Sequence, residues 1–505
     1  MRHHFANFRR LAALFALFAL AGCSTVENSH RQKSDMMRSY EAGDNAAAQE
    51  EIDRKLREPT WYNTSVVGSG DEIMWRLEAG GMNFHLGKFR RAIDEFKAAE
   101  RLIGEYDDRA KVSLRDAGAE IGTSVTNLNT LPYRGFCRDR MALAIYKSLA
   151  YLGADDEGAF RAQLRRLRNE QKKVQDDYRD FFEREKAELE AARKENPEAA
   201  KKARESSSGT KLADNADNAE FKAGMETVRK IANRGYGNFL NPAATFLSGL
   251  GAMRDGNYDN ARIEFKRLYE AMPANPLARR YYATSLKLAD RPVPAELNGT
   301  EPFQFPLDRD CVFVLFANGR SAAFRQIALY FPVMTAWPMC EFYEAPFSGV
   351  RVSAGGVRYD SMLLADMDGI IAQEFQERLP GMIARIVLST LIKEGAYYAG
   401  LAAVEKSDMD PLVKAITMLS VAIGGTAYRT AMNTADTRSW EILPKEFQLT
   451  QFPMPEKREI SIVLIGRGNS ARKVKLPEKC RSAIVFVSAP SERNVRCHVL
   501  PLSSK

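Results

Sequence analysis

The chain has few of the residues on which most enzymatic sites are built. Its 505 residues include only five histidines, six cysteines and four tryptophans. Acid–base and nucleophilic sites most often use histidine, and beyond position 22 only His30, His85 and His498 remain. No CxxC, HExxH or Asp-rich loop occurs, so the sequence predicts neither a metal site nor a cofactor. These features favour a protein without catalytic activity. A glycosidase-type site built from two carboxylates remains an alternative, because Asp and Glu occur throughout the chain.

Concentrated positive charge is also missing. The formal net charge is +8, and three arginines at positions 2, 9 and 10 contribute to it, which leaves +5 for the rest of the chain. Nucleic-acid binding needs a cationic face rather than a dispersed excess. We therefore expect no nucleic-acid partner.

The N-terminal apolar run is too short to span a membrane. Leu11 to Leu20 is uninterrupted but falls well below the ~20 residues that a spanning helix needs. It follows a basic leader and ends in Leu20-Ala21-Gly22-Cys23, which resembles the lipobox of bacterial lipoproteins. The resemblance implies a lipoprotein signal peptide over residues 1–22, and a Cys23 that is modified with diacylglycerol and a further acyl chain such as palmitate. The alternative is an ordinary signal peptide with a chance cysteine.

The residue after the lipobox cysteine indicates the destination. Ser24 rather than Asp follows Cys23, which favours the outer membrane over the inner membrane. The expected location is the outer membrane of a Gram-negative envelope, lipid-anchored and facing the periplasm. Five cysteines then remain in an oxidising compartment, so at least one is unpaired. Cys480 could pair with Cys497 and Cys311 with Cys340, and five buried thiols that include Cys137 are equally compatible with the sequence.

What the chain does contain is a pattern of paired helices. Phe246 to Pro276 predicts two short helices joined by a tight turn at Gly256, with apolar residues at the spacing of one buried face. Ile73 to Leu102 has a similar pattern, and Met141 to Leu167 has a degenerate one. The spacing of glycine, alanine and aromatic residues is close to that of tetratricopeptide repeats.

The chain is expected to divide into six segments. Residues 171–204 contain ten Lys/Arg and nine Asp/Glu, which indicates a solvated helical arm that is broken near Pro197. The predicted segments are a signal peptide (1–22), a lipidated N-terminus and tether (23–70), a first helical repeat region (71–170), a charged helical insertion and linker (171–235), a second, tetratricopeptide-like repeat region (236–295) and an α+β C-terminal domain (303–505).

The C-terminal region changes to strand-like patterns. Cys311 to Phe316 is a continuous β-branched and aromatic run, which predicts a buried strand, and Phe324 to Phe331 is its expected hairpin partner. Further strands are expected at Ile460–Ile465 and Ala483–Val487, and helices at Ile370–Val404 and Pro411–Asn433. The predicted fold class is an α-helical tetratricopeptide-like repeat region followed by an α+β C-terminal domain.

Three stretches resemble a family of uncharacterised bacterial tetratricopeptide-repeat-containing lipoproteins. They are Leu131–Arg168, Tyr236–Pro276 and Ala435–Pro455, and the likeness extends along most of the chain after residue 22. Gly158 and Gln163 depart from the family pattern in the middle repeat. The resemblance implies an architecture and a location rather than an activity.

One constellation stands out as a possible contact for a partner or ligand. Asp436, Arg438 and Trp440 lie two residues apart ahead of a predicted strand, and an ion pair with an aromatic anchor is the favoured interpretation. We expect a non-catalytic lipid-anchored scaffold that binds envelope proteins through a concave helical surface. The alternatives are an envelope enzyme that acts on peptidoglycan or surface polysaccharide through C-terminal carboxylates, or a component of a secretion or polymer-export complex. The sequence leaves the oligomeric state open.

Overall fold

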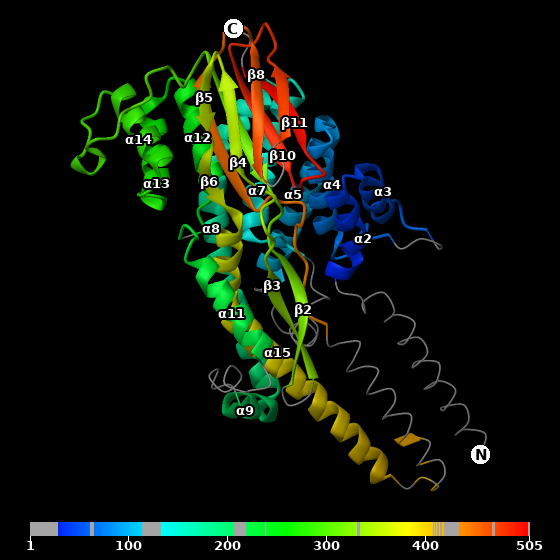
Figure 1. The fold of residues 1–505 in the computed structure, drawn as a ribbon. Helices are drawn as coiled ribbons and strands as arrows, with labels where there is room; N and C mark the ends of the chain where they lie inside the picture. The colour runs from blue at the N-terminus through cyan, green and yellow to red at the C-terminus, as the bar shows by residue number, and fades with distance from the viewer. Residues whose placement is uncertain are drawn as a thin grey trace.

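The computed structural model describes residues 29–60, 65–113, 133–206, 219–237, 239–330, 334–407, 434–466 and 470–502, with isolated positions between 409 and 418. Figure 1 shows a wide upper region, which contains helices and two β-sheets, and a narrow lower region built mainly of long helices. We call the upper region the head. We call the lower region, which contains the second half of α8 together with α9, α11, α15 and the hairpin β2–β3, the arm.

Helices precede the strands along the chain, and one further long helix follows β6. Their bounds are α2 Ser29–Ala42, α3 Asn45–Lys55, α4 Glu72–His85, α5 Phe89–Ser113, α7 Cys137–Gly153, α8 Glu157–Glu195, α9 Pro197–Ser206, α11 Ala219–Ala232, α12 Pro242–Arg254, α13 Tyr258–Ala271, α14 Pro276–Leu288 and α15 Met367–Glu405. A helical region followed by a sheet-containing C-terminal region is therefore the observed order.

Helix pairs form the helical layer of the head. The helices predicted within Phe246–Pro276 are confirmed as α12 and α13, and Gly256 in the turn between them has a φ of +72° that favours glycine. Gly249 of α12 lies against the ring of Phe265 on α13, where an added Cβ would come within 2.8 Å of a ring atom. The small residue lets the two helices approach closely, as the sequence pattern indicated.

The strands form two main sheets and one hairpin. Their bounds are β1 Cys311–Asn318, β2 Ala323–Tyr330, β3 Met334–Glu341, β4 Phe347–Ala354, β5 Val357–Asp360, β6 Met362–Asp366, β7 Glu446–Pro453, β8 Glu459–Gly466, β9 Ser470–Lys475, β10 Ser482–Ala489 and β11 Arg496–Leu502. The five-stranded sheet has the order β11-β10-β1-β7-β6, the four-stranded sheet has the order β5-β4-β8-β9, and β2 pairs with β3 alone.

Strand β1 lies at the centre of the five-stranded sheet. It pairs in parallel with β10 and antiparallel with β7. Phe313 and Leu315 face the helices, whereas Val312 and Val314 face the four-stranded sheet. Because both faces are buried, the strand is apolar along almost its whole length, and the prediction of a buried strand here is confirmed.

The helical layer covers one face of the five-stranded sheet. The ring centroids of Phe84 and Phe486 lie 5.0 Å apart, and those of Phe246 and Phe313 lie 6.0 Å apart. The helices and this sheet therefore share one hydrophobic core, which differs from the expectation of a separate C-terminal domain. One face of these helices therefore packs against the sheet.

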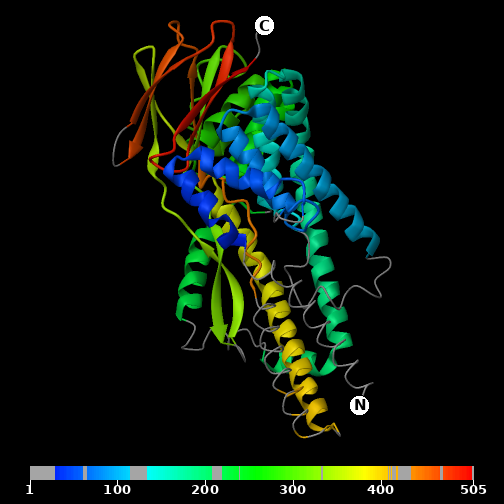
Figure 2. The ribbon, with the colours of Figure 1, turned by 90° about the vertical axis from the view of Figure 1, so that its right-hand side faces the viewer.

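The predicted hairpin between Cys311–Phe316 and Phe324–Phe331 is wrong. Strand β2 pairs with β3 because both edges of β1 are already occupied by β10 and β7. Phe324 and Ile327 of β2 pack in a second core with α11 and α15. The hairpin thus belongs to the arm, as Figure 2 shows from the side.

The predicted tether is wrong for residues 29–55. These residues form α2 and α3, and Met36, Met37 and Tyr40 are buried in the main core. The polar composition of this segment suggested that it is exposed to solvent. Lys33, however, is fully buried against carboxylates. The N-terminal helices are therefore part of the head.

The charged insertion belongs to a continuous helix. Helix α8 runs through it as far as Glu195, and the predicted break near Pro197 is confirmed by the start of α9. Leu189 and Leu388 are buried together, so the helix packs on α15 rather than standing free in solvent. Most of the predicted helix Pro411–Asn433 lies outside the described residues. Within the portion of the chain that the structure describes, no helix is both long and apolar enough to cross a membrane.

Candidate functional site

The residues predicted as a contact site lie on the segment 435–441, which precedes β7. Arg438 donates from Nε to Oδ1 of Asp436 at 2.8 Å and from Nη2 to Oδ2 at 2.9 Å, and it lies 3.3 Å from Asp71. Burial acts to raise the pKa of Asp436, but the adjacent Arg438 outweighs it and holds the pKa below its usual value. Trp440 is separate from this pair, because its ring lies 5.8 Å from those of Phe96 and Tyr146 in the core.

The three residues are thus an ion pair and an aromatic anchor on different sides of one segment. The lipobox residues Leu20, Ala21, Gly22 and Cys23 lie outside the described residues. All five cysteines that the structure describes are unpaired thiols, so neither proposed disulfide is formed.

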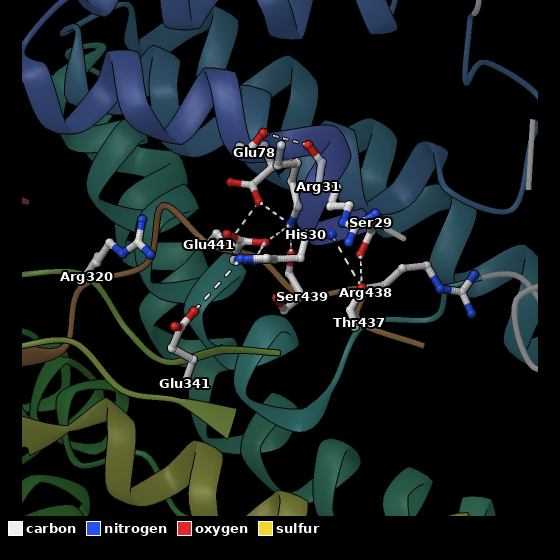
Figure 3. Close-up of polar contacts among 12 residues, drawn as sticks. Ser29, His30, Arg31, Glu78, Arg320, Glu341, Thr437, Arg438, Ser439 and Glu441 are labelled. Atoms are coloured by element: carbon white, nitrogen blue, oxygen red, sulfur yellow. Dashed lines mark hydrogen bonds and ion pairs between the residues drawn. The ribbon is translucent and has the colours of Figure 1, made fainter. Parts of the chain in front are cut away.

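A group of buried charges joins this segment to the N-terminal helices. Lys33 of α2 lies 3.1 Å from Glu78 of α4 and 2.9 Å from Glu441, and it donates to the backbone oxygen of Ser439. His30 lies at the rim, with Nδ1 3.6 Å from Glu441. Figure 3 shows Glu78 and Glu441 beside His30, while Arg438 points away from them. We call Lys33, Glu78, Glu441 and His30 the anchor cluster.

Backbone groups complete the anchor cluster. Glu78 accepts the N–H of Glu441 at 2.8 Å and that of Ile442 at 3.2 Å. Burial raises the pKa of Glu78 to about 7, against the attraction of Lys33. For Glu441 the burial is outweighed by Lys33, which holds its pKa below the usual value. The cluster therefore links α2, α4 and the segment 435–441 through two buried ion pairs of Lys33 and two backbone hydrogen bonds to Glu78.

Two carboxylates with contrasting pKa values are a pattern that acid–base enzymes use. In the anchor cluster, however, the exposed fractions of the Glu78 and Glu441 side chains are 0% and 2%. A substrate has no access to them, so the geometry favours a structural role for this cluster.

A cavity of about 180 Å³ lies where the head meets the arm. Its walls come from the start of α7, from α8 and α15, from the hairpin β2–β3, and from the segment 434–438. We call it the arginine cavity because, among the residues that the structure describes, six arginines line it: Arg134, Arg138, Arg140, Arg378, Arg385 and Arg438.

Three of these arginines make ion pairs with acidic residues in the same wall. Arg140 lies 2.8 Å from Asp107 and 3.1 Å from Asp177. Arg385 lies 3.4 Å from Glu185, and Arg438 binds Asp436 as described above. These pairs neutralise much of the charge that the cavity wall carries.

Arg138 differs from these three. Its side chain is almost fully buried and its Nε lies 3.2 Å from Oδ1 of Asp139. The guanidinium lies over the rings of Phe136 and Phe324, with Cζ 4.4 Å and 5.0 Å from the ring centroids. Its Nη1 and Nη2 have no hydrogen-bond partner among the residues that the structure describes.

Carboxylates hold the start of α7 in place. Glu374 of α15 accepts the backbone N–H of Cys137 at 3.1 Å and of Arg138 at 3.4 Å, and burial raises its pKa. Asp139 accepts the N–H of Phe136 at 2.9 Å and the O–H of Tyr133. Both acids nearest Arg138 are therefore fixed by other donors, so the guanidinium has a defined position and free donor capacity.

The sequence interpretation found one of these features and missed the rest. It identified Asp436 and Arg438, which line the cavity, but neither the anchor cluster nor Arg138. The run Cys137-Arg138-Asp139-Arg140 at the start of an otherwise apolar helix was a usable signal, because charges there must be buried or capped. The sequence around Lys33 gave no indication that this residue is buried, because its neighbours in sequence are polar.

Within the described residues, no group of three or more His, Cys, Asp or Glu side chains is arranged to hold a metal ion. Comparisons of the chain with protein-family models, with curated proteins and with solved structures found no match. The functional argument therefore rests on the geometry of the two clusters.

Proposed function

We propose that the protein is a lipid-anchored scaffold of the cell envelope that binds partner proteins on the periplasmic side without catalysis. The observation that carries this proposal is the anchor cluster. Helix α2 begins at Ser29, six residues after the lipobox cysteine Cys23, and Lys33 fixes this helix to the core of the head.

The short distance along the chain limits how far the head can move from the membrane. Six residues reach at most ~22 Å when fully extended. Acyl chains contribute ~0.8 kcal/mol per buried CH₂, so a doubly or triply acylated cysteine is a firm anchor. A head held this close to the lipid surface suits a protein that positions others in the envelope better than a domain on a long flexible tether.

The helix pairs support a repeat-type scaffold. The close approach of Gly249 to Phe265 recurs in α4 and α5, where an added Cβ on Gly80 would meet the ring of Phe96 at 2.3 Å. This small-to-aromatic contact is what a tetratricopeptide-like pair requires. Because one face of these pairs is covered by the sheet, we assign the partner contact to the arm.

The arm has the shape and the exposed residues of a contact surface. It projects from the head in both views (Figures 1 and 2). Tyr398 of α15 has an exposed fraction of 61%, and tyrosine is among the residues that contribute most to protein interfaces. The proposal therefore expects partners to contact the second half of α15.

Site-specific crosslinking in intact cells tests the proposal. A photoreactive residue replaces Tyr398 in the arm or, as a matched control, Val293 in the head, which has an exposed fraction of 47%. We expect discrete protein adducts from position 398, few from position 293, and loss of both the adducts and palmitate labelling in Cys23→Ala. Absence of adducts from labelled, correctly localised protein would overturn the scaffold proposal.

A further inference from the structure

Strand β5 forms one edge of the four-stranded sheet, and this edge is open. Among the described residues β5 pairs with β4 alone. At the end of β5 the N–H of Ser361 donates to the backbone oxygen of Val350 on β4 at 2.9 Å. Bonded and non-bonded residues alternate along an antiparallel ladder. The backbone N–H and C=O groups of Arg358 and Asp360 therefore point away from β4, toward the open edge.

The other outer strands of the two main sheets carry features that discourage pairing. Strand β9 has the exposed Lys473 and Lys475, and β11 contains Pro501. Lysine and proline on an edge strand oppose the addition of another strand. The edge of β6 is partly occupied, because the backbone oxygen of Leu363 accepts the side-chain amide of Asn275 at 2.7 Å. Strand β5 has neither lysine, nor proline, nor such a cover.

We propose that a second copy of this chain pairs with β5 across a twofold axis at Tyr359. This inference does not depend on the proposed scaffold function. Antiparallel pairing about this axis places Arg358 of each copy opposite Asp360 of the other. Both residues direct their backbone groups outward, so each of these two pairs forms two backbone hydrogen bonds.

The side-chain charges select this register. Arg358 and Asp360 are both exposed, and they share one face of β5 because side chains alternate along a strand. Moving the axis to position 358 or 360 would place two arginines or two aspartates opposite each other, which is unfavourable, whereas opposite charges attract. Arg351 of β4 holds Asp360 in place, with its Nε 2.6 Å from Oδ1. The carboxylate thus has a defined position in which to meet an arginine of the second copy.

Apolar side chains of the same edge fit the pairing. Val357 is 52% exposed, and Tyr359 stacks on Phe452 with ring centroids 4.9 Å apart. At the twofold axis Tyr359 lies opposite Tyr359 of the second copy, and Val357 lies diagonal to it. Aromatic side chains reach across both kinds of neighbour, and such pairs stabilise a sheet. The pairing therefore covers apolar surface that a single chain leaves in water.

Disulfide trapping of the full-length chain in intact cells tests the register. Tyr359→Cys places two thiols in a non-hydrogen-bonded pair with Cα atoms ~4.5 Å apart, within the range of a disulfide. Arg358→Cys is the matched control, because the twofold axis separates its two Cα atoms by about 9 Å, which is outside that range.

We expect mild oxidation to link Tyr359→Cys into a dimer at a yield about fivefold or more above that of Arg358→Cys. The wild type, whose described cysteines are buried or half-buried, gives the background. Equal yields from the two variants, or no dimer from folded Tyr359→Cys, would overturn the proposal. An adduct with a different protein in place of the dimer would also overturn it, because an extended segment of another chain would then occupy the edge.

Charge variants that keep Tyr359 decide the question if Tyr359→Cys does not fold. Two differently tagged full-length copies are expressed together and copurified in mild detergent. Arg358→Asp in both copies, or Asp360→Arg in both, places like charges opposite each other, and we expect copurification to fall by about tenfold. Lys473→Asp on β9 is the control and should change nothing, because this side chain lies on another edge.

The mixed pair gives the sharpest result. Arg358→Asp in one copy and Asp360→Arg in the other restores an opposite charge at both positions, so copurification should return to the wild-type level. Unchanged copurification when both copies carry the same variant, or no recovery between two folded variants in the mixed pair, would show that β5 does not pair in this register.

Discussion

The anchor cluster and the arginine cavity are both buried, and both include residues of the segment 435–441, yet their cations are paired differently. In the anchor cluster, Lys33 has two carboxylates within 3.1 Å and a backbone oxygen. In the cavity, Arg138 has one carboxylate at 3.2 Å, and both of its terminal nitrogens have no partner among the described residues.

The difference separates a joint whose charges are paired from one whose guanidinium is only partly paired. Buried ion pairs lose much of their Coulomb energy to desolvation, so their main effect is that neither partner can be removed without leaving a buried charge. A cluster that the chain completes by itself therefore fixes the positions of its elements. A cluster in which buried donors have no acceptor lowers the stability of the folded protein.

The largest effect is expected where the pairing is complete. Lys33→Met leaves Glu78 and Glu441 facing each other without a cation, and we expect the free energy of unfolding to fall by about 3–5 kcal/mol. Urea denaturation followed by circular dichroism measures the change. Lys473→Met is the control, because Lys473 is 83% exposed and 3.9 Å from its acid, and it should leave the midpoint unchanged. Equal effects of the two variants would contradict the assignment of a structural joint.

The pH dependence of the anchor cluster gives the next largest effect. The pKa of Glu78 is raised from 4.5 to about 7 in the folded protein, so the folded chain holds this proton more tightly than the unfolded chain. The free energy of unfolding of the wild type should therefore fall as the pH rises from about 4.5 to about 7. A shift of this size corresponds to about 3 kcal/mol at most.

Glu78→Gln removes this titration. The amide imitates the protonated carboxyl at every pH, so the stability of the variant relative to the wild type should improve steadily as the pH rises through the same window. Urea midpoints at several pH values measure the difference between the two proteins. A difference that does not change with pH would show that Glu78 titrates near the usual value of a carboxyl group, and that its burial has no thermodynamic consequence.

Local patterns predicted the features of the fold that depend on near neighbours. The helix pair around Gly256 and the buried strand β1 follow from patterns within short stretches of the sequence, and the structure has both. The parallel pairing of β1 with β10 was not predictable in this way, because Val312 and its partner Ala483 are far apart in the chain. The expected hairpin of β1 failed for the same reason, since the competing strands were distant in sequence.

The same distinction applies to the candidate site. Asp436 and Arg438 are two residues apart, so their ion pair could be inferred from the sequence. The arginine cavity needs the start of α7, the hairpin β2–β3 and the middle of α15 to converge, and no periodicity reports that convergence. Helix α2 was predicted to be part of a polar tether. Its burial could not be foreseen, because the charge of Lys33 is compensated by Glu78 and Glu441, which are distant in the sequence.

The smallest effect on stability is expected in the cavity. Arg138→Met removes two unsatisfied nitrogens along with one ion pair, and Asp139 keeps the N–H of Phe136 and the O–H of Tyr133. We therefore expect the free energy of unfolding to change by only about 1 kcal/mol. Urea denaturation followed by circular dichroism measures the change. A loss as large as that of Lys33→Met would mean that Arg138 is a structural charge, and the two clusters would then be of one kind.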